Sequence, residues 1–500
     1  MKPHGVVDLD AFFDVVVEGY NRGTASCSLP ADVELARSII PPATGRQRDF
    51  SYIAPELPEF LPAKCVGCME CVTACPDTAL LARVAEASTV AGDPSAWSRT
   101  KKYADNFETK GQPPGLFRIF VDPTKCKGCA ECVDVCGDRA ALKMIPKSAE
   151  GMARAGRAME EFYALKETPS RYVLEKSLMD IMLTDRALLY VGGAGSCMGC
   201  GEGTAVRMML AATGFVHGPE GVAIVASTGC NTVFGSTYPF NPYRVAWMNS
   251  LFENAPTVAM GVRAAWDLRG WKEKRLWVIG GDGAMNDIGF QSLSRLLMSG
   301  MDIKVLVLDT QVYSNTGGQA SGSTFVGQAT SFTQSGKSEA RKEIGLLALM
   351  HGNVYVAQTT PAHTNHFYRA VMEANAFPGP ALVNVYASCM PEHGIADDMG
   401  YHQSKFAVES RAFPLFTYDP RKGDAVSQRL DIKTNPAWDK DWWTRPKTGE
   451  VVDWVSWARS ERRFAKHFDA AGKGDAALLA AQDERLRNWR RIQELAGVRP

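Results

Sequence analysis

The chain has 500 residues, with 55 Lys plus Arg against 55 Asp plus Glu, so its formal net charge is zero. A hydrophobic content of 45% and a charged content of 22% are typical of a globular protein of roughly two to four domains. The charge balance argues against a nucleic-acid or anionic-membrane binder. We expect no signal peptide, because the N-terminus lacks a basic start followed by an apolar core, and no membrane span, because no window approaches about 18 apolar residues.

Composition and periodicity divide the chain into segments. The first is expected to be a leader that ends in the Pro-rich linker PELPEFLP, and the last a helical extension whose final helix covers 475–497. Between them we expect a cysteine-rich unit with a polar insert at 76–125, a helical connector, and a unit of alternating strands and helices. The expected segments are 1–60, 61–147, 148–185, 186–405 and 406–500.

Five short apolar runs in the largest segment predict strands, at 221–227, 275–281, 303–309, 353–358 and 381–387. Segments of helical periodicity separate most of them, such as 287–300 and 363–377. Wholly apolar strands that alternate with helices indicate a parallel sheet covered on both faces. The fold class is therefore α/β in this segment.

Two stretches carry the same cysteine spacing, C-x2-C-x2-C-x3-C: CVGCMECVTAC at 65–75 and CKGCAECVDVC at 126–136. In such a run the first three thiolates bind one [4Fe–4S] cluster and the fourth binds the other. One cluster is therefore expected on Cys65, Cys68, Cys71 and Cys136. The other is expected on Cys126, Cys129, Cys132 and Cys75.

Structural zinc and disulfides are the alternatives for these cysteines. Zinc usually takes two pairs of ligands with a longer gap between them, and cysteines two residues apart suit chelation better than disulfides. A reducing cytoplasm is the expected compartment. Of the 13 cysteines, Cys27 lies outside all groups and is expected to be a small apolar residue rather than a ligand.

A second chemical pattern follows two of the expected strands. Strand 275–281 runs into Gly281, Asp282 and Gly283, and strand 303–309 runs into TQVYSN at 310–315. Mg²⁺ takes hard oxygen ligands and shares them with a diphosphate, glycines let the backbone approach phosphates, and the helix beginning near Asn286 offers its N-terminus. A GDG turn alone is a weak signal, but oxygens at two adjacent strand ends predict a diphosphate–Mg²⁺ site.

These motifs together resemble the C-terminal half of pyruvate:ferredoxin oxidoreductase, within the 2-oxoacid:ferredoxin oxidoreductase superfamily. The resemblance runs from about 61 to 394 and includes GSCMGCGEGTAV (195–206), STGCNTVFGSTYP (227–239), WMNSLFENA (247–255), GDGAMNDIGFQSLSRLLMSG (281–300), VLDTQVYSNTGGQAS (307–321) and YASCMPEHG (386–394). It implies an α/β thiamine diphosphate-binding domain of the pyrophosphate type, joined to an α+β ferredoxin-like domain with two [4Fe–4S] clusters.

Individual residue roles follow from the resemblance. It implies a third [4Fe–4S] cluster, nearest the thiamine diphosphate, on Cys197, Cys200, Cys230 and Cys389. It implies that Asp282, the Thr310 side chain and the Val312 carbonyl coordinate Mg²⁺, with Gly281 and Gly283 beside the diphosphate. Asn315 is expected near the thiazolium and the substrate as the catalytic residue, and Glu202 is expected to help position the cofactor.

The resemblance also implies what lies outside these 500 residues. Complete members of the family have a pyrimidine-binding domain with a catalytic Glu, and regions that contact CoA and the substrate carboxylate. We find no second sheet domain for them, so a separate catalytic partner subunit is expected to complete the active site. Electrons are expected to leave to ferredoxin, flavodoxin or a reductase subunit.

The implied activity is CoA-dependent oxidative decarboxylation of a 2-oxoacid to acyl-CoA and CO2, with electrons passed through three clusters. Pyruvate is the favoured substrate and 2-oxoglutarate the second candidate. A pure electron-transfer subunit with a degenerate cofactor site, or a non-redox thiamine decarboxylase or ligase, are the competing functions. His363, His366 and His393 receive no role and are expected to be surface or packing residues.

Overall fold

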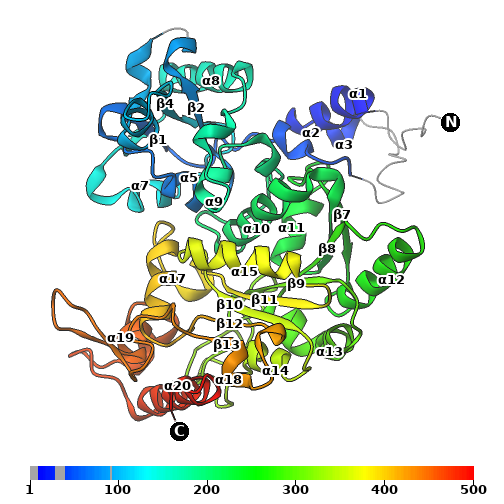
Figure 1. Ribbon diagram of the computed structural model, residues 1–500, viewed down its shortest axis with the longest axis vertical. Helices are drawn as coiled ribbons and strands as arrows, with labels where there is room; N and C mark the ends of the chain where they lie inside the picture. Colours follow the sequence, from blue (N-terminus) through cyan, green and yellow to red (C-terminus); the bar gives the residue numbers. More distant parts are fainter. Residues whose placement is uncertain (1–8, 29–39, 91–92, 500) are drawn as a thin grey trace.

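The computed structural model describes residues 9–28, 40–90 and 93–499. At its centre is an eight-stranded sheet of order β13-β12-β10-β11-β9-β8-β6-β7 (Figure 1). The six strands from β6 to β11 are parallel, and β12 and β13 continue the sheet antiparallel. Their bounds are β6 Val222–Ser227, β7 Ala246–Ser250, β8 Arg275–Gly281, β9 Lys304–Asp309, β10 Tyr355–Thr359, β11 Ala381–Tyr386, β12 Phe416–Tyr418 and β13 Leu430–Asp431.

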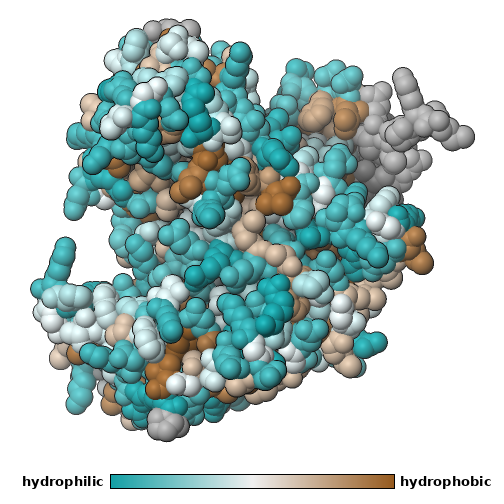
Figure 2. Space-filling model, in the orientation of Figure 1, coloured by the Kyte–Doolittle hydropathy of each residue, from teal (hydrophilic) through white to brown (hydrophobic). Residues whose placement is uncertain are grey.

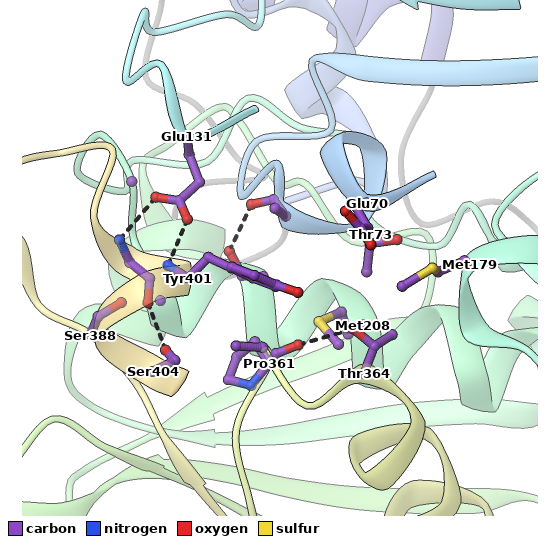
Figure 3. Close-up of a pocket in the computed structure, with 16 residues that line it drawn as sticks. Glu70, Thr73, Glu131, Met179, Met208, Pro361, Thr364, Ser388, Tyr401 and Ser404 are labelled. Carbon is purple, nitrogen blue, oxygen red and sulfur yellow. Dashed lines mark hydrogen bonds between the residues drawn. The ribbon is translucent and has the colours of Figure 1, made fainter. Parts of the chain in front are cut away.

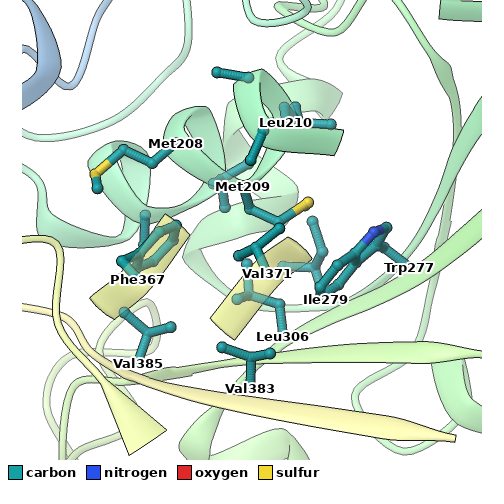
Figure 4. Close-up of a cluster of buried hydrophobic side chains, with 14 of the residues drawn as sticks. Met208, Met209, Leu210, Trp277, Ile279, Leu306, Phe367, Val371, Val383 and Val385 are labelled. Atoms are coloured by element: carbon teal, nitrogen blue, oxygen red, sulfur yellow. The ribbon is translucent and has the colours of Figure 1, made fainter. Parts of the chain in front are cut away.

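Helices cover both faces of this sheet, as its uninterrupted apolar strands require. On one face α10 (Gly201–His217) and α15 (Thr364–Ala376) bury Met208, Met209 and Phe367 against Trp277 and Ile279 of β8 (Figure 4). On the other face lie α12 (Ala255–Leu268), α13 (Phe290–Met298), α14 (Ile344–Leu349) and α20 (Ala476–Leu495). Successive residues of a strand point to opposite faces, so the whole strand must be apolar.

The α/β fold class is confirmed, and all five expected strands are present. The strands that the sequence did not reveal lie at the edges of the sheet. β7 is largely exposed, so its residues need not be apolar. β12 and β13 have three and two residues, which is too short for a periodic signal, and they belong to the segment predicted to be a helical extension.

The cysteine-rich unit is built from small antiparallel sheets (Figure 1). Its bounds are β1 Glu56–Phe60, β2 Leu80–Glu86, β3 Ser98–Arg99, β4 Gly115–Val121 and β5 Leu142–Pro146, with α5 Glu70–Ala74, α6 Asn106–Glu108 and α7 Glu131–Asp134. Two expectations differ from this arrangement. The Pro-rich segment predicted as a linker forms β1, which tolerates Pro58 because it is an edge strand. The insert at 76–125, predicted to be polar, contains β2 and β4, which bury Leu80 and Phe117.

The remaining elements connect or flank these two units. They are α1 Leu9–Ala11, α2 Glu18–Asn21, α3 Ala25–Ser28, α8 Ala149–Ala164, α9 Leu178–Ile181, α11 Cys230–Ser236, α16 Met390–His393, α17 Gly400–Glu409, α18 Val426–Arg429, α19 Trp454–Arg459, β14 Trp443–Thr444 and β15 Val451–Val452. Trp454 and Trp457 of α19 are fully buried against Phe325 and Tyr386. The extension therefore packs as part of the core.

The face of the molecule in Figure 2 carries apolar residues in small patches among polar ones. None of the helices in the described ranges combines the length and the apolar character needed to cross a membrane.

Candidate functional site

Three buried oxygen atoms meet where β8 and β9 end side by side. Asp282, directly after β8, is fully buried, and its Oδ1 lies 3.1 Å from Oγ1 of Thr310. The same hydroxyl lies 3.1 Å from the Val312 carbonyl oxygen. Adjacent ligands of octahedral Mg²⁺, each at about 2.1 Å from the ion, lie about 3 Å apart. The three oxygens that the sequence predicts as Mg²⁺ ligands thus have a spacing and a hardness that fit this ion.

Two carboxyl groups at this place are buried, and neither forms an ion pair with a cationic side chain among the described residues. Burial, and next the charge of Asp309, raise the pKa of Asp282 to about 8, while Asp309 itself is paired with Arg341. Burial also raises the pKa of Glu202 to about 8, with a contribution from Asp282. Within the described residues Glu202 Oε2 has no hydrogen-bond partner. A buried carboxyl oxygen without a hydrogen-bond partner costs folding free energy. The site therefore suits a bound group that donates a hydrogen bond to Glu202.

A cavity of about 330 Å³ lies along the carboxyl ends of β6, β8 and β9. Thr228 follows β6, Gly283 follows β8, and Asn315 belongs to the loop after β9, so each strand contributes to the wall. A Cβ on Gly283 would lie 2.3 Å from the Tyr313 ring, so only glycine fits there. This is the edge of an open parallel sheet at which ligands bind, and the cavity is lined by Glu202, Thr228, Gly229, Cys230, Phe252, Gly281, Gly283, Ala284, Thr310, Val312, Tyr313, Ser314, Asn315 and Thr316.

A second cavity, of about 490 Å³, is lined by all four of the remaining predicted cluster ligands, Cys197, Cys200, Cys230 and Cys389. Burial raises the pKa of Cys389 to about 12, as expected for a thiol that loses its proton only when metal binds. A set of four thiols around one cavity fits a [4Fe–4S] cluster.

The two cavities adjoin, because they share part of their lining. Both are bordered by Glu202, Cys230, Thr310, Ser314 and Asn315. The residue predicted to be catalytic, Asn315, therefore lines both the cavity of the thiols and the cavity of Thr310. A group bound in one cavity would lie beside a group bound in the other.

The eight cysteines of the ferredoxin-like unit act on one another across the two runs. Burial raises the pKa of Cys71, and so do the charges of Cys68, Cys65 and Cys136. The pKa of Cys132 is likewise raised by burial and then by Cys129, Cys75, Cys71 and Cys126. Cysteines of both runs thus lie near one another, and the crossed grouping stays a prediction.

Among the residues that the structure describes, no three Cys, His, Asp or Glu side chains converge as the ligands of one metal ion would. The thiolates around a cube bind separate iron atoms and need not converge. The role of these residues as ligands stays a prediction.

The second cysteine loop is joined to the sheet domain by a buried carboxylate (Figure 3). Glu131, between Cys129 and Cys132, accepts hydrogen bonds from the backbone nitrogens of Gly400, at 3.0 Å, and Tyr401, at 2.6 Å. These are the first two residues of α17, and the free N–H groups of a helix start favour an acidic partner. The contact holds the cysteine-rich unit against the cofactor domain.

Sequence reasoning missed the buried residues that contact residues 310 and 311 in the loop after β9. His393, expected to be a surface or packing residue, is fully buried, and its Nε2 lies 2.8 Å from the Thr310 carbonyl oxygen. Arg463 pairs with Glu461 and donates from Nη2 to Gln311 Oε1 at 3.1 Å. His393 lies within the motif YASCMPEHG, which was a usable signal. Nothing near Arg463 in the sequence indicates its place beneath residues 310–312.

Two family models match the chain. Residues 227–385 match the thiamine pyrophosphate enzyme C-terminal TPP-binding domain, and residues 64–140 match the 4Fe-4S dicluster domain. The molecule therefore joins a thiamine pyrophosphate-binding domain to a dicluster domain. This confirms the expectation of thiamine diphosphate and [4Fe–4S] clusters as its cofactors.

Its relatives are pyruvate oxidoreductases. A pyruvate-flavodoxin oxidoreductase of Rhodospirillum rubrum is 29% identical over 515 residues, which cover 87% of this chain and 41% of that protein. A pyruvate:ferredoxin oxidoreductase of Moorella thermoacetica is 29% identical over 525 residues, which cover 87% of this chain and 42% of that protein. The chain is thus homologous to the pyruvate oxidoreductases, as its motifs predict, and spans about two fifths of their length.

One solved structure, a 2-oxoglutarate:ferredoxin oxidoreductase from Magnetococcus marinus, has a TM-score of 0.37 and 23% identity. The alignment covers 43% of this chain and 71% of that one.

Proposed function

We propose that this chain is the electron-transfer and cofactor-binding part of a CoA-dependent 2-oxoacid:acceptor oxidoreductase, with pyruvate as the favoured substrate. The observation that carries the proposal is the shared wall between the oxygen-lined cavity and the four-cysteine cavity. A thiamine enzyme without redox chemistry does not require an iron–sulfur cluster beside its cofactor. A pure electron carrier does not require the Mg²⁺-binding oxygens of Asp282, Thr310 and Val312.

When bound, thiamine diphosphate supplies the carbanion chemistry of decarboxylation. The task of this chain's residues is to hold it. Asp282, Thr310 and Val312 would bind the Mg²⁺ of the diphosphate, and Gly281 and Gly283 would lie beside the phosphates. Glu202 would accept a hydrogen bond on its free oxygen. Asn315 would face the reacting end of the cofactor from the wall that it shares with the thiols.

The cysteines would hold the clusters through which electrons leave the cofactor. We assign a cluster nearest the cofactor to Cys197, Cys200, Cys230 and Cys389, and two further clusters to the crossed groups of the dicluster unit. Free thiols in such number suit the reducing cytoplasm. Ferredoxin, flavodoxin or a reductase subunit would take the electrons at the dicluster unit.

The remaining catalytic parts would come from a partner subunit. The relatives are more than twice as long as the stretch that this chain matches. We therefore assign the pyrimidine-binding, CoA and substrate-carboxylate contacts to a second polypeptide. We place the first domain at 56–147, because β1 pairs with β5, and extend the second from 186–405 to 186–499, because β12, β13 and α20 belong to its sheet and core.

The test is anaerobic purification of the chain with whatever binds to it, followed by measurement of iron, acid-labile sulfide and thiamine diphosphate per chain. We expect about 12 iron atoms, four for each of three clusters, with one thiamine diphosphate and a second polypeptide. A panel of 2-oxoacids with CoA and a viologen dye then identifies the substrate, pyruvate being expected and 2-oxoglutarate the main competitor.

A matched pair of variants checks the assignment. Cys230→Ser is expected to leave about eight iron atoms, as two clusters require, whereas Cys27→Ser should leave the iron content unchanged. About eight iron atoms in the wild type and no thiamine diphosphate, even with Mg²⁺ and the partner supplied, would contradict the proposal and leave an electron carrier.

A further inference from the structure

A buried arginine stands between the cofactor domain and the dicluster unit. Arg207 of α10 is 4% exposed, and its Nη1 donates to the carbonyl oxygens of Val72, at 2.6 Å, and Cys75, at 3.1 Å, with a longer contact of 3.4 Å to that of Thr73. These carbonyls lie at the C-terminal end of α5. A helix end of this kind has unpaired carbonyls and attracts a cation, so the guanidinium caps α5 from the other domain.

The charge of Arg207 is not neutralised by a carboxylate. Within residues 9–28, 40–90 and 93–499, no Asp or Glu forms an ion pair with Arg207, although most other buried arginines have one. Burial lowers the pKa of Arg207, and Asp77, an acidic side chain whose charge acts in the opposite direction, is bound to the buried Lys127 at 2.7 Å. A buried cation without a counter-charge is costly. An anionic group bound beside Arg207 would supply this counter-charge.

The geometry indicates which group that is. Arg207 Nη1 lies 3.1 Å from the carbonyl oxygen of Cys75, which is a predicted ligand of the cluster with Cys126, Cys129 and Cys132. Its other two partners, the carbonyls of Val72 and Thr73, belong to residues that are not predicted ligands. Among the described residues Arg207 therefore contacts a predicted ligand of one of the two clusters.

We propose that Arg207 is the buried counter-charge of the cluster held by Cys75, Cys126, Cys129 and Cys132, and that it raises the reduction potential of that cluster. A cube with four thiolates is anionic, and reduction adds one electron and one further negative charge to it. A cation held nearby at low dielectric stabilises the reduced state more than the oxidised state. The cluster that faces the cofactor domain would therefore be the better acceptor of the two in the dicluster unit. This inference rests on the cluster assignment proposed above.

Three variants of the whole protein, purified with its partner, test this role. Arg207→Gln removes the charge but keeps an N–H donor for the carbonyls, and Arg207→Lys keeps the charge. Thr204→Val is the matched control, because Thr204 Oγ1 lies 3.4 Å from the Ala74 carbonyl at the same helix end and carries no charge. Iron content and a redox titration followed by electron paramagnetic resonance are measured for each. The signals are assigned by their loss in Cys136→Ser and Cys389→Ser.

We expect a negative shift of one midpoint potential in Arg207→Gln, that of the cluster on Cys75, with the other two unchanged. In Arg207→Lys this midpoint potential should return most of the way to the wild-type value. In Thr204→Val all potentials should match those of the wild type. An unshifted potential in Arg207→Gln, or an equal shift of all clusters, would overturn the proposal.

Loss of iron is also decisive. If Arg207→Gln loses this cluster and Arg207→Lys retains it, the counter-charge is needed for assembly and the proposal stands. If both variants lose it, the guanidinium is a structural cap and the proposal is wrong. A wild type that lacks these clusters would instead overturn the proposed function itself.

Discussion

The dicluster unit and the cofactor domain place their functional groups in opposite ways. In the dicluster unit eight cysteines come from two short runs, and the surrounding sheets have only two and three strands. In the cofactor domain the groups come from the ends of three parallel strands and from loops as far apart as Cys197 and Cys389, above a large core covered on both faces. A metal-binding group can thus be encoded by residues close together in the chain, whereas a cofactor cavity forms only when the sheet is complete.

The largest expected effect tests whether the spacing of the cysteines determines which of them bind the same cluster. Replacement of Cys136 by Ser should abolish the cluster whose other three ligands are Cys65, Cys68 and Cys71, because the fourth cysteine of each run serves the other group. Iron should fall from about 12 to about eight atoms per chain, the loss of one cube. Retention of that cluster, with loss of the one on Cys126, Cys129 and Cys132, would contradict the crossed arrangement.

The second expected effect concerns the cavity that the sheet creates. Asp282→Asn should weaken binding of thiamine diphosphate with Mg²⁺ by at least about 10–100-fold, the range seen when even an indirect support of a metal ligand is lost. Titration calorimetry measures the affinity, and cofactor plus Mg²⁺ should raise the melting temperature of the wild type but not of the variant. The iron content, as the control, should be unchanged.

A smaller effect is expected from the C-terminal extension that supports this cavity. Glu461 and Arg463 are both buried, and they pair beneath the loop that carries Thr310. Arg463→Met leaves Glu461 as an unpaired buried charge, which should cost about 3–5 kcal/mol of unfolding free energy and weaken thiamine diphosphate binding. Arg490→Met, which removes a half-exposed pair with Asp441, should cost about 0–1 kcal/mol. Equal destabilisation by the two variants in urea titrations would refute the supporting role.

A last effect is a pH dependence of the unfolding free energy that arises in the cofactor domain. Burial, then the charges of Arg369 and His363, lower the pKa of His366 from 6.5 to about 3, while Asp431 acts in the opposite direction. The unfolded state therefore binds more protons between these values, so the stabilising contribution of His366 is complete above pH 6.5 and is lost as the pH falls towards 3. His366→Gln should flatten this part of the stability curve of the cluster-free chain, measured by urea unfolding. An unchanged slope would show that His366 does not titrate on unfolding.

The two regions also differ in how far they can be predicted. Cluster groups in the dicluster unit follow from spacing alone, because a thiolate that is two residues from another can reach the same cube. The strands of the cofactor domain follow from their apolar runs, because a strand covered on both faces has no polar positions. β7 and β12 escaped prediction, since an exposed edge or three residues leave no pattern.

The sequence by itself determined the α/β class and the pairing of Asp282 with the loop after the next strand, and it predicts the crossed cysteine groups, since each depends on residues close in the chain or on adjacent strand ends. Only the tertiary structure decided that Arg207 contacts the Cys75 carbonyl from another domain and that Arg463 lies beneath Gln311. These contacts join residues far apart in the chain, and no local spacing or periodicity encodes them, because they form only when the sheet, its helices and the dicluster unit have packed together.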